Sequence, residues 1–239
     1  GELYGPNFPL VTVKDWVKTQ AMLADHLGIE TWAVIIGGSL GGMQCMEWSI
    51  TYPNRLKHTF VIAAAPKLST QNIAFNEVAR QVIRSDRDFN DGYYYKNDNK
   101  PTHGLMQARM LGHITYLSDD ALDEKFGRQL RDGEIKFGYD VEFQIESYLR
   151  YQGRSFVDRF DANSYLYITR AMDYFDLVKQ FNGNLSKAFE KTKTKFFIIS
   201  FTSDWLYPTS ENKEIVIALN SSGANVGFIE INSDKGHDS

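Results

Sequence analysis

A glycine-rich segment, GGSLGG at residues 37–42, constrains the fold of this chain more than any other. It follows a short apolar run at 32–36 and precedes a helical pattern that Pro53 ends. A G-x-S-x-G motif between a buried strand and a helix is typical of a nucleophile elbow, whose sharp turn needs glycines because neighbouring Cβ atoms would clash. The segment predicts Ser39 as a nucleophile and the N–H of Leu40 as an oxyanion donor. A glycine turn that only packs, or that cradles a phosphate, is the alternative.

Further apolar runs place this motif in a parallel sheet. Three of them are solid enough for buried strands: 59–65, 196–201 and 226–231. Helical patterns at short spacing between strands indicate parallel strands with crossover helices. Residues 76–188 have a different residue pattern, in which charged and aromatic residues are mixed at helical spacing. We expect an α/β core over residues 1–75 and 189–239, interrupted by a helical lid insertion at 76–188.

The number of strands is small for such a core. About four can be counted, and a half sheet with an open edge would be a poor independent fold, because its unpaired backbone groups invite pairing with other chains. We therefore expect this chain to be an incomplete portion of a larger sheet.

Composition excludes several classes of protein. The 239 residues include 26 Lys and Arg against 30 Asp and Glu, and the formal charge of −4 argues against a nucleic-acid or anionic membrane surface as partner. No apolar stretch approaches the length of a membrane span. The single cysteine, Cys45, cannot form an internal disulfide, which favours a reducing, cytoplasmic location. No grouping has metal-ligand spacing, so we expect no metal.

A nucleophilic serine needs a base and an orienting carboxylate, in this class in the chain order Ser, Asp or Glu, His. His237 follows the 226–231 run, and Asp204 follows the 196–201 run. Sites in open α/β sheets gather at these carboxyl ends of strands. Asp234 is the rival acid, but it lies close to His237 in sequence. The alternative for each residue taken singly is a structural one: Asp204 would be a solvated loop residue, and His237 would be a surface residue.

Four sequence segments together resemble one known family: GGSLGGMQCMEWSITYP, RFDANSYLYITRAMDYFD, SDWLYP and GHDS. They are similar to the homoserine O-acetyltransferase family of the α/β-hydrolase superfamily. The resemblance implies a mostly parallel sheet with helices on both faces and a helical lid. It also implies ping-pong transfer of an acetyl group from acetyl-CoA to the hydroxyl of L-homoserine, in methionine biosynthesis. It implies a homodimer with lid contacts, and no cofactor beyond acetyl-CoA as co-substrate.

The resemblance carries over to individual positions. The family's triad is matched by three residues: Ser39, Asp204 and His237. Arg109, in ARMLGHITY, matches the arginine that holds the substrate, and Asp238 matches a substrate-binding aspartate. Tyr116 falls where similar enzymes have a pocket tyrosine. Family members begin earlier and continue beyond GHDS, so the second oxyanion donor cannot be named from this sequence.

Several other functions stay open at this stage. Related enzymes differ in donor and acceptor, so succinyl-CoA or L-serine could replace acetyl-CoA or homoserine. The same triad serves serine ester hydrolases, and a catalytically silent binding protein is a third possibility. An amino-acid clamp of Arg109 and Asp238 favours transfer. The alternative for this pair is a surface arginine with a neighbouring acid and an aspartate that caps a loop.

Overall fold

The computed structural model describes residues 3–97 and 99–239, which divide into two compact units. The sheet unit comprises residues 11–69, 171–233 and 239, and the helical unit comprises 1–10, 70–170 and 234–238. The boundaries between these units lie at residues 69/70 and 170/171. The boundaries between core and lid expected from the sequence lie at 75/76 and 188/189. The division into core and lid by residue number stays a prediction.

The sheet unit contains four parallel strands in the order in which they occur along the chain: β1 (Trp32–Gly38), β2 (Leu56–Ile62), β3 (Lys195–Phe201) and β4 (Val226–Ile231). The parallel α/β sheet expected from the sequence is thereby confirmed. The second strand begins and ends earlier than the apolar run at 59–65. It ends at Ile62 because Ala63 turns the chain with φ of +47°. The run 63–65 is buried but lies in the turn that follows β2.

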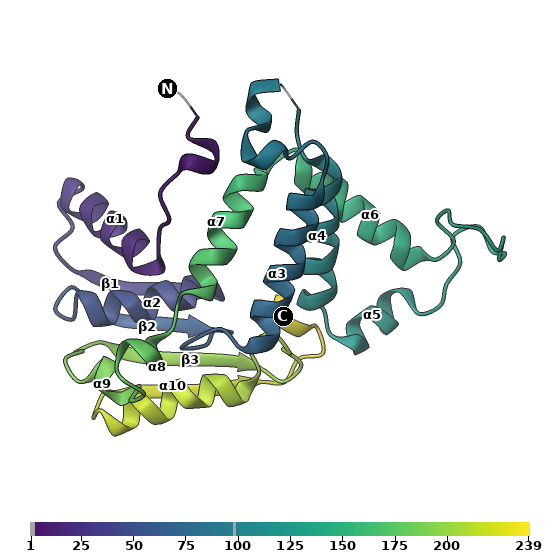
Figure 1. Cartoon of the computed structure of the whole chain (residues 1–239). Coiled ribbons are helices and arrows are strands. Elements are labelled where there is room, and N and C mark those ends of the chain that lie inside the picture. Colours follow the sequence, from purple (N-terminus) through teal and green to yellow (C-terminus); the bar gives the residue numbers. More distant parts are fainter. Residues whose placement is uncertain (1–2, 98) are drawn as a thin grey trace. The chain divides into compact units, whose positions relative to one another are not determined.

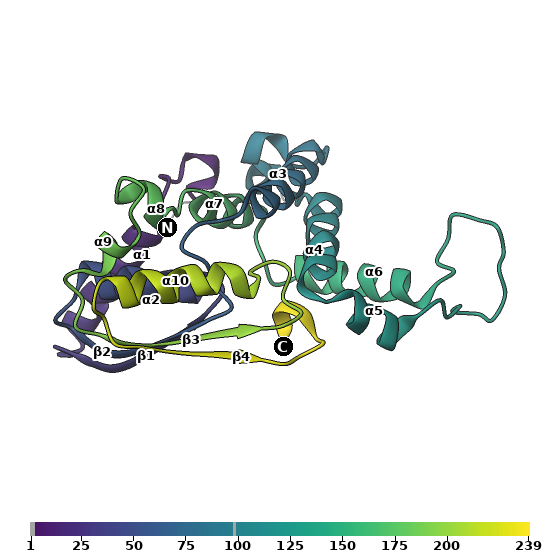
Figure 2. The same cartoon turned by 90° about the horizontal axis from the view of Figure 1, so that it is seen from below.

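Helices cover one face of this sheet, namely α1 (Val13–His26), α2 (Leu40–Thr51) and α10 (Thr209–Ser221), as Figure 2 shows. Two short helices, α8 (Leu177–Gln180) and α9 (Ser186–Phe189), belong to the same unit. Fully buried Met43 and Met46 of α2 lie on the covered side, and Trp48 packs in a cluster with residues of α1 and β2. Helices on both faces were expected, and within the described residues three main helices cover the same face.

The other face of the sheet exposes apolar side chains at alternate strand positions: Val34, Ile36, Phe197, Ile229 and Ile231. The strand register places them on one side, because Ile36 pairs with Phe60, which pairs with Phe197. The Phe60 and Phe197 rings stack with centroids 4.8 Å apart.

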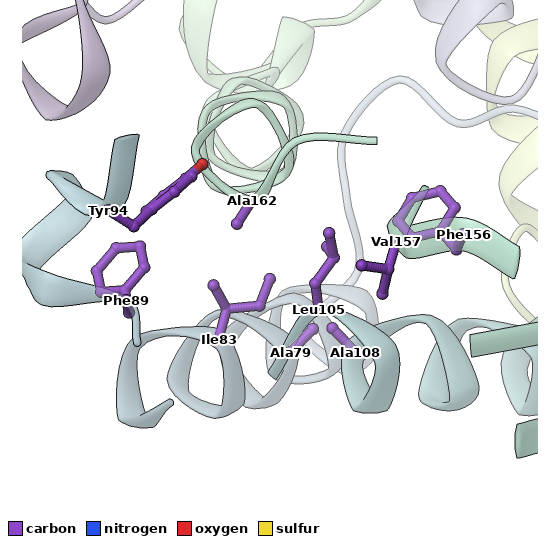
Figure 3. Packing of buried hydrophobic residues seen from close by; sticks show 9 residues of the cluster. All are labelled: Ala79, Ile83, Phe89, Tyr94, Leu105, Ala108, Phe156, Val157 and Ala162. Atoms are coloured by element: carbon purple, nitrogen blue, oxygen red, sulfur yellow. The ribbon is translucent and has the colours of Figure 1, made fainter. Parts of the chain in front are cut away.

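The helical unit packs its long helices against one another (Figure 1): α3 (Thr70–Ser85), α4 (Thr102–Tyr116), α5 (Asp119–Phe126), α6 (Gln144–Val157) and most of α7 (Ala162–Asp173). Among its described residues, four 3₁₀ turns complete it: η1 (Gly5–Asn7), η2 (Asn90–Gly92), η3 (Tyr94–Asn97) and η4 (Gly236–Asp238). Figure 3 shows its core, in which Ile83 of α3, Leu105 of α4 and Phe156 of α6 are buried together. Among the described residues, no helix is long and apolar enough to cross a membrane.

Candidate active site

Ser39 forms a strained turn between β1 and α2. Its backbone has φ of +54° and ψ of −121°, a conformation that costs a residue with a side chain about 1–3 kcal/mol. The turn is held by the Ser39 N–H, which donates to the Ile62 carbonyl over 2.9 Å, and by the Gly42 and Met43 N–H groups, which donate to the Ser39 carbonyl. The backbone geometry is that of the nucleophile elbow expected from the sequence.

Glycine is needed at position 37 because the start of α2 folds back onto the end of β1. A Cβ atom there would lie 2.3 Å from the carbonyl carbon and oxygen of Gly41, and 2.9 Å from the Cys45 sulfur. Backbone atoms of a helix cannot move away as a flexible side chain would. The close approach therefore explains why the sequence has glycine on the strand side of the turn.

This contact predicts a difference between two neighbouring glycines. Gly37→Ala should lower the free energy of unfolding by about 3 kcal/mol or more, because overpacking against fixed backbone cannot relax. Gly38→Ala is the matched control, since a Cβ there would meet only the Ile62 carbonyl oxygen at 3.8 Å. It should cost less than about 1 kcal/mol. Urea denaturation of both variants tests the prediction, and equal losses would contradict it.

The helix α2 begins directly after Ser39, which occupies the N-cap position. The Ser39 side chain makes no capping hydrogen bond, so its hydroxyl is not engaged at the helix end. The first N–H groups of a helix have no intrahelical acceptor and carry the positive end of the helix dipole. Leu40 supplies the first of these groups, and its role as oxyanion donor stays a prediction.

Asp204 lies in the turn after β3 and is buried, with 3% of its surface exposed. Its Oδ1 atom accepts hydrogen bonds from the N–H groups of Leu206 and Tyr207, each 3.0 Å long. Buried Asn212 stabilises this turn, because its Nδ2 donates to the Tyr207 carbonyl, while its Oδ1 accepts from the Ala64 N–H in the turn after β2. The alternative that Asp204 is a solvated loop residue is therefore wrong.

Glu211 at the start of α10 is a neighbour that the sequence did not single out. Burial, with the negative charges of Glu214 and Asp204, raises the pKa of the Glu211 carboxyl to about 7. Its Oε2 atom is buried and has no hydrogen-bond partner among the described residues. Lys67 opposes the shift. The Glu211 carboxyl group, whose pKa is raised to about 7, thus lies within electrostatic reach of the Asp204 carboxyl group.

The raised pKa predicts a pH-dependent stability. In the unfolded chain Glu211 ionises near pH 4.5. Its contribution to the free energy of unfolding is therefore full below that pH and is lost as the pH rises to about 7. Glu211→Gln removes this titration. Between pH 5 and pH 8 the wild type should lose about 1–2 kcal/mol of its free energy of unfolding relative to the variant. This range is reduced because Glu211 is partly exposed. Urea denaturation at both pH values measures this difference. Glu190→Gln, a change at an exposed residue, is the control. Equal pH dependence of the wild type and Glu211→Gln would contradict the prediction.

The helical unit brings together four of the predicted site residues. The guanidinium carbon of Arg109, on α4, lies 5.5 Å from the ring centroid of Tyr116 and 4.8 Å from that of Phe156. The rings of Tyr116 and His237 have centroids 6.1 Å apart. Burial raises the pKa of Tyr116, and the charges of Arg109 and Asp238 act on it in opposite directions. Arg109 is not a surface residue, since its Nε atom is buried without a partner among the described residues.

A close backbone approach positions the turn that carries His237 and Asp238. Gly236 has φ of +82°, and a Cβ atom there would lie 2.5 Å from the Ser118 nitrogen and 2.6 Å from the Tyr116 carbonyl oxygen. The Ser118 hydroxyl donates to the Asp234 carbonyl, and Lys235 forms an ion pair of 2.6 Å with Glu124. The end of α4 and the start of α5 therefore fix η4.

The predicted triad residues are divided between the two units. Ser39, Leu40 and Asp204 belong to the sheet unit, and His237 belongs to the helical unit. The triad assignment stays a prediction. Cys45 offers no competing nucleophile, because burial raises the pKa of its thiol to about 11. Across residues 3–97 and 99–239, no three His, Cys, Asp or Glu side chains are grouped so that they could hold a metal ion.

Two further polar residues lie beside Arg109 and were not identified from the sequence as site residues. His113 follows Arg109 by four positions on α4, and Tyr148 approaches it from α6, with its hydroxyl oxygen 3.2 Å from His113 Nδ1. The spacing of four residues places Arg109 and His113 on one helix face, which is the only sequence signal for this pair.

Known proteins are similar to this chain in sequence and in fold. The sequence model of the α/β-hydrolase fold matches residues 3–226. A homoserine O-succinyltransferase of Acidithiobacillus ferrooxidans is 59% identical over 240 residues, which is 100% of this chain and 63% of that protein. The homoserine O-acetyltransferase of Bacillus anthracis superimposes with a TM-score of 0.90 at 23% identity, over 99% of this chain and 63% of the other. Esterase E22 superimposes with a TM-score of 0.86 at 26% identity, over 99% and 64%.

These comparisons agree with the α/β fold of the chain. The chain spans about 63% of the length of the curated relative that it matches. The match to the fold model covers most of the chain and includes β1, the Ser39 turn and α2. The chain therefore belongs to the α/β-hydrolase fold family.

Proposed function

We propose that this chain carries the catalytic centre of a homoserine O-acyltransferase that works through an acyl-serine intermediate. The observation that carries the proposal is the cluster of Arg109, Tyr116 and Asp238 in the helical unit. A cation over the Tyr116 ring and an anion within electrostatic reach of it suit a zwitterionic amino acid, which must exchange its hydration for opposite charges when it is bound. The name of the relative that is 59% identical supports the same substrate.

In the proposed reaction, Ser39 and His237 act twice. His237 takes the Ser39 proton as the serine oxygen attacks the thioester, the C–S bond breaks, and CoA leaves as the thiol with that proton. The homoserine hydroxyl then gives its proton to His237 and attacks the acyl-serine, whose ester C–O bond breaks as the proton returns to Ser39. Asp204 orients the imidazole and stabilises the imidazolium, and Leu40 N–H stabilises the oxyanion.

The acyl donor is succinyl-CoA in this proposal, although the sequence resemblance alone favoured acetyl-CoA. Support comes from the relative named homoserine O-succinyltransferase, which is 59% identical. The acetyltransferase structure is 23% identical and supports only the fold. With either donor the product would be an O-acylhomoserine, an intermediate in methionine biosynthesis. A homodimer and a cytoplasmic location accompany the proposal as expectations, and sedimentation of the protein would test the first.

Ester hydrolysis is the second candidate, because the chain is also similar to an esterase at 26% identity. The two functions differ in the second step: a hydrolase gives the acyl group to water, whereas a transferase excludes water and uses the amino acid. The Arg109 and Asp238 pair would have no purpose for an uncharged ester.

One assay separates these functions. The protein is given succinyl-CoA or acetyl-CoA with homoserine, with L-serine or with no amino acid, and thiol release and O-acylated product are followed. We expect thiol release to depend on homoserine, to match O-acylhomoserine formation, and to be faster with succinyl-CoA. Release that no amino acid stimulates would identify a hydrolase, and a preference for serine would reassign the acceptor.

A further inference from the structure

His113 is a buried polar residue for which the proposed reaction has no role so far. It lies on α4 one turn after Arg109, with 7% of its surface exposed. Its Nδ1 atom is 3.2 Å from the Tyr148 hydroxyl, and the two rings meet edge to face with centroids 5.6 Å apart. Its Nε2 atom is buried and has no hydrogen-bond partner among the described residues. Buried polar atoms are almost always paired, so this atom needs an explanation.

The surroundings favour one protonation state of this imidazole. Burial lowers the pKa of His113, the positive charges of Arg109, Arg159 and Lys125 lower it further, and Asp238 opposes them. A neutral ring carries one N–H, and when the Tyr148 hydroxyl donates to Nδ1 that N–H is at Nε2. The unpaired Nε2 is then a hydrogen-bond donor.

A second unpaired donor lies one turn away on the same helix face. The Nε atom of Arg109 is buried without a partner among the described residues, and the rings of Phe156 and Tyr116 lie within 5.5 Å of the guanidinium carbon. Two buried donors near several positive charges favour an anionic acceptor, and the two oxygens of a carboxylate can accept from two donors.

We propose that His113 is a binding residue for the substrate carboxylate: its Nε2–H donates to the acceptor's α-carboxylate beside Arg109, and Tyr148 holds the imidazole in place. The inference rests on the proposed homoserine acyl transfer. It adds to Arg109 a second residue that recognises the carboxylate of the acceptor. The carboxylate of a succinyl donor has the same chemistry, so the test separates the two sources.

The test compares acceptors and donors with and without a carboxylate. 3-Amino-1-propanol is homoserine without its carboxylate, and acetyl-CoA is the donor without one. His113→Leu removes the donor, and His113→Gln restores an N–H near the Nε2 position. His113→Leu should lower the kcat/KM ratio of homoserine to 3-amino-1-propanol about 10-fold to 100-fold, the effect of one hydrogen bond to a charged group. His113→Gln should recover most of that ratio.

Matched controls separate binding from folding. Tyr148→Phe should lower the same ratio by a smaller factor, and it keeps the test open if His113→Leu does not fold. His103→Leu on α4 and Tyr151→Phe on α6 change exposed residues of the same types and should leave the ratio unchanged.

Three results would contradict the inference or the function on which it rests. An equal loss with both alcohols would show that His113 is only structural and would overturn the inference. A fall in the succinyl-CoA to acetyl-CoA ratio for acylation, with the acceptor ratio unchanged, would assign the residue to the donor and also overturn it. A wild-type protein that acylates neither alcohol would refute the proposed function itself.

Discussion

Ser39→Ala should eliminate the acyl-enzyme and lower kcat by at least about 10⁴-fold, because residues of a catalytic triad act as a unit and the others cannot replace the nucleophile. Intact-mass spectrometry after incubation with the acyl-CoA, without an amino acid, is the direct measurement. The wild type should gain one acyl group, and the variant should gain none.

A serine on the helix that follows Ser39 provides the control for this experiment. Ser49 of α2 is buried, and its hydroxyl donates to the Met46 carbonyl over 2.7 Å. Ser49→Ala should lose that hydrogen bond, worth about 0.5–1.5 kcal/mol of stability, but it should still be acylated. An acylated Ser39→Ala protein would remove Ser39 from the mechanism, whatever its backbone conformation.

The Ser39 turn could be predicted because its determinants are local in the sequence. Strand, glycine, serine and helix follow one another within 32–51, so each requirement can be checked by reading along the chain. The structure adds what the sequence does not contain, namely how closely Gly41 approaches Gly37. The second strand shows the limit of such reading, because the apolar run 59–65 continues through the turn at Ala63 while the strand does not.

Residues that depend on packing between helices were harder to predict. His113 is an example, since nothing near it in sequence reveals the Tyr148 hydroxyl on α6. Glu211 has an ordinary position in the first turn of a helix, and its raised pKa arises from burial and from Asp204 and Glu214. Position along a chain shows which residues end a strand, but burial and charge of side chains from other elements decide how each of them titrates.

Arg109→Lys should separate the two halves of the proposed reaction. The guanidinium is planar, and its carbon lies over the rings of Tyr116 and Phe156, 5.5 Å and 4.8 Å from their centroids. It offers two parallel N–H donors to a carboxylate, whereas lysine offers one compact charge. A lysine ammonium has no counterpart of the buried Nε–H. The loss should therefore fall on the step that binds the amino acid.

The expected loss in the homoserine step is about 2–5 kcal/mol, the cost of leaving a buried charge poorly paired, or roughly 30-fold to 5,000-fold in its rate constant. Acylation of Ser39 by the acyl-CoA should change much less. Rapid mixing measures the first step by thiol release, and addition of homoserine to the isolated acyl-enzyme measures the second. Arg87→Lys, a change at a side chain that is 92% exposed, is the control and should affect neither step. Equal losses in both steps, or none in either, would place Arg109 outside the acceptor site, because only a residue that contacts the amino acid can affect the second step selectively.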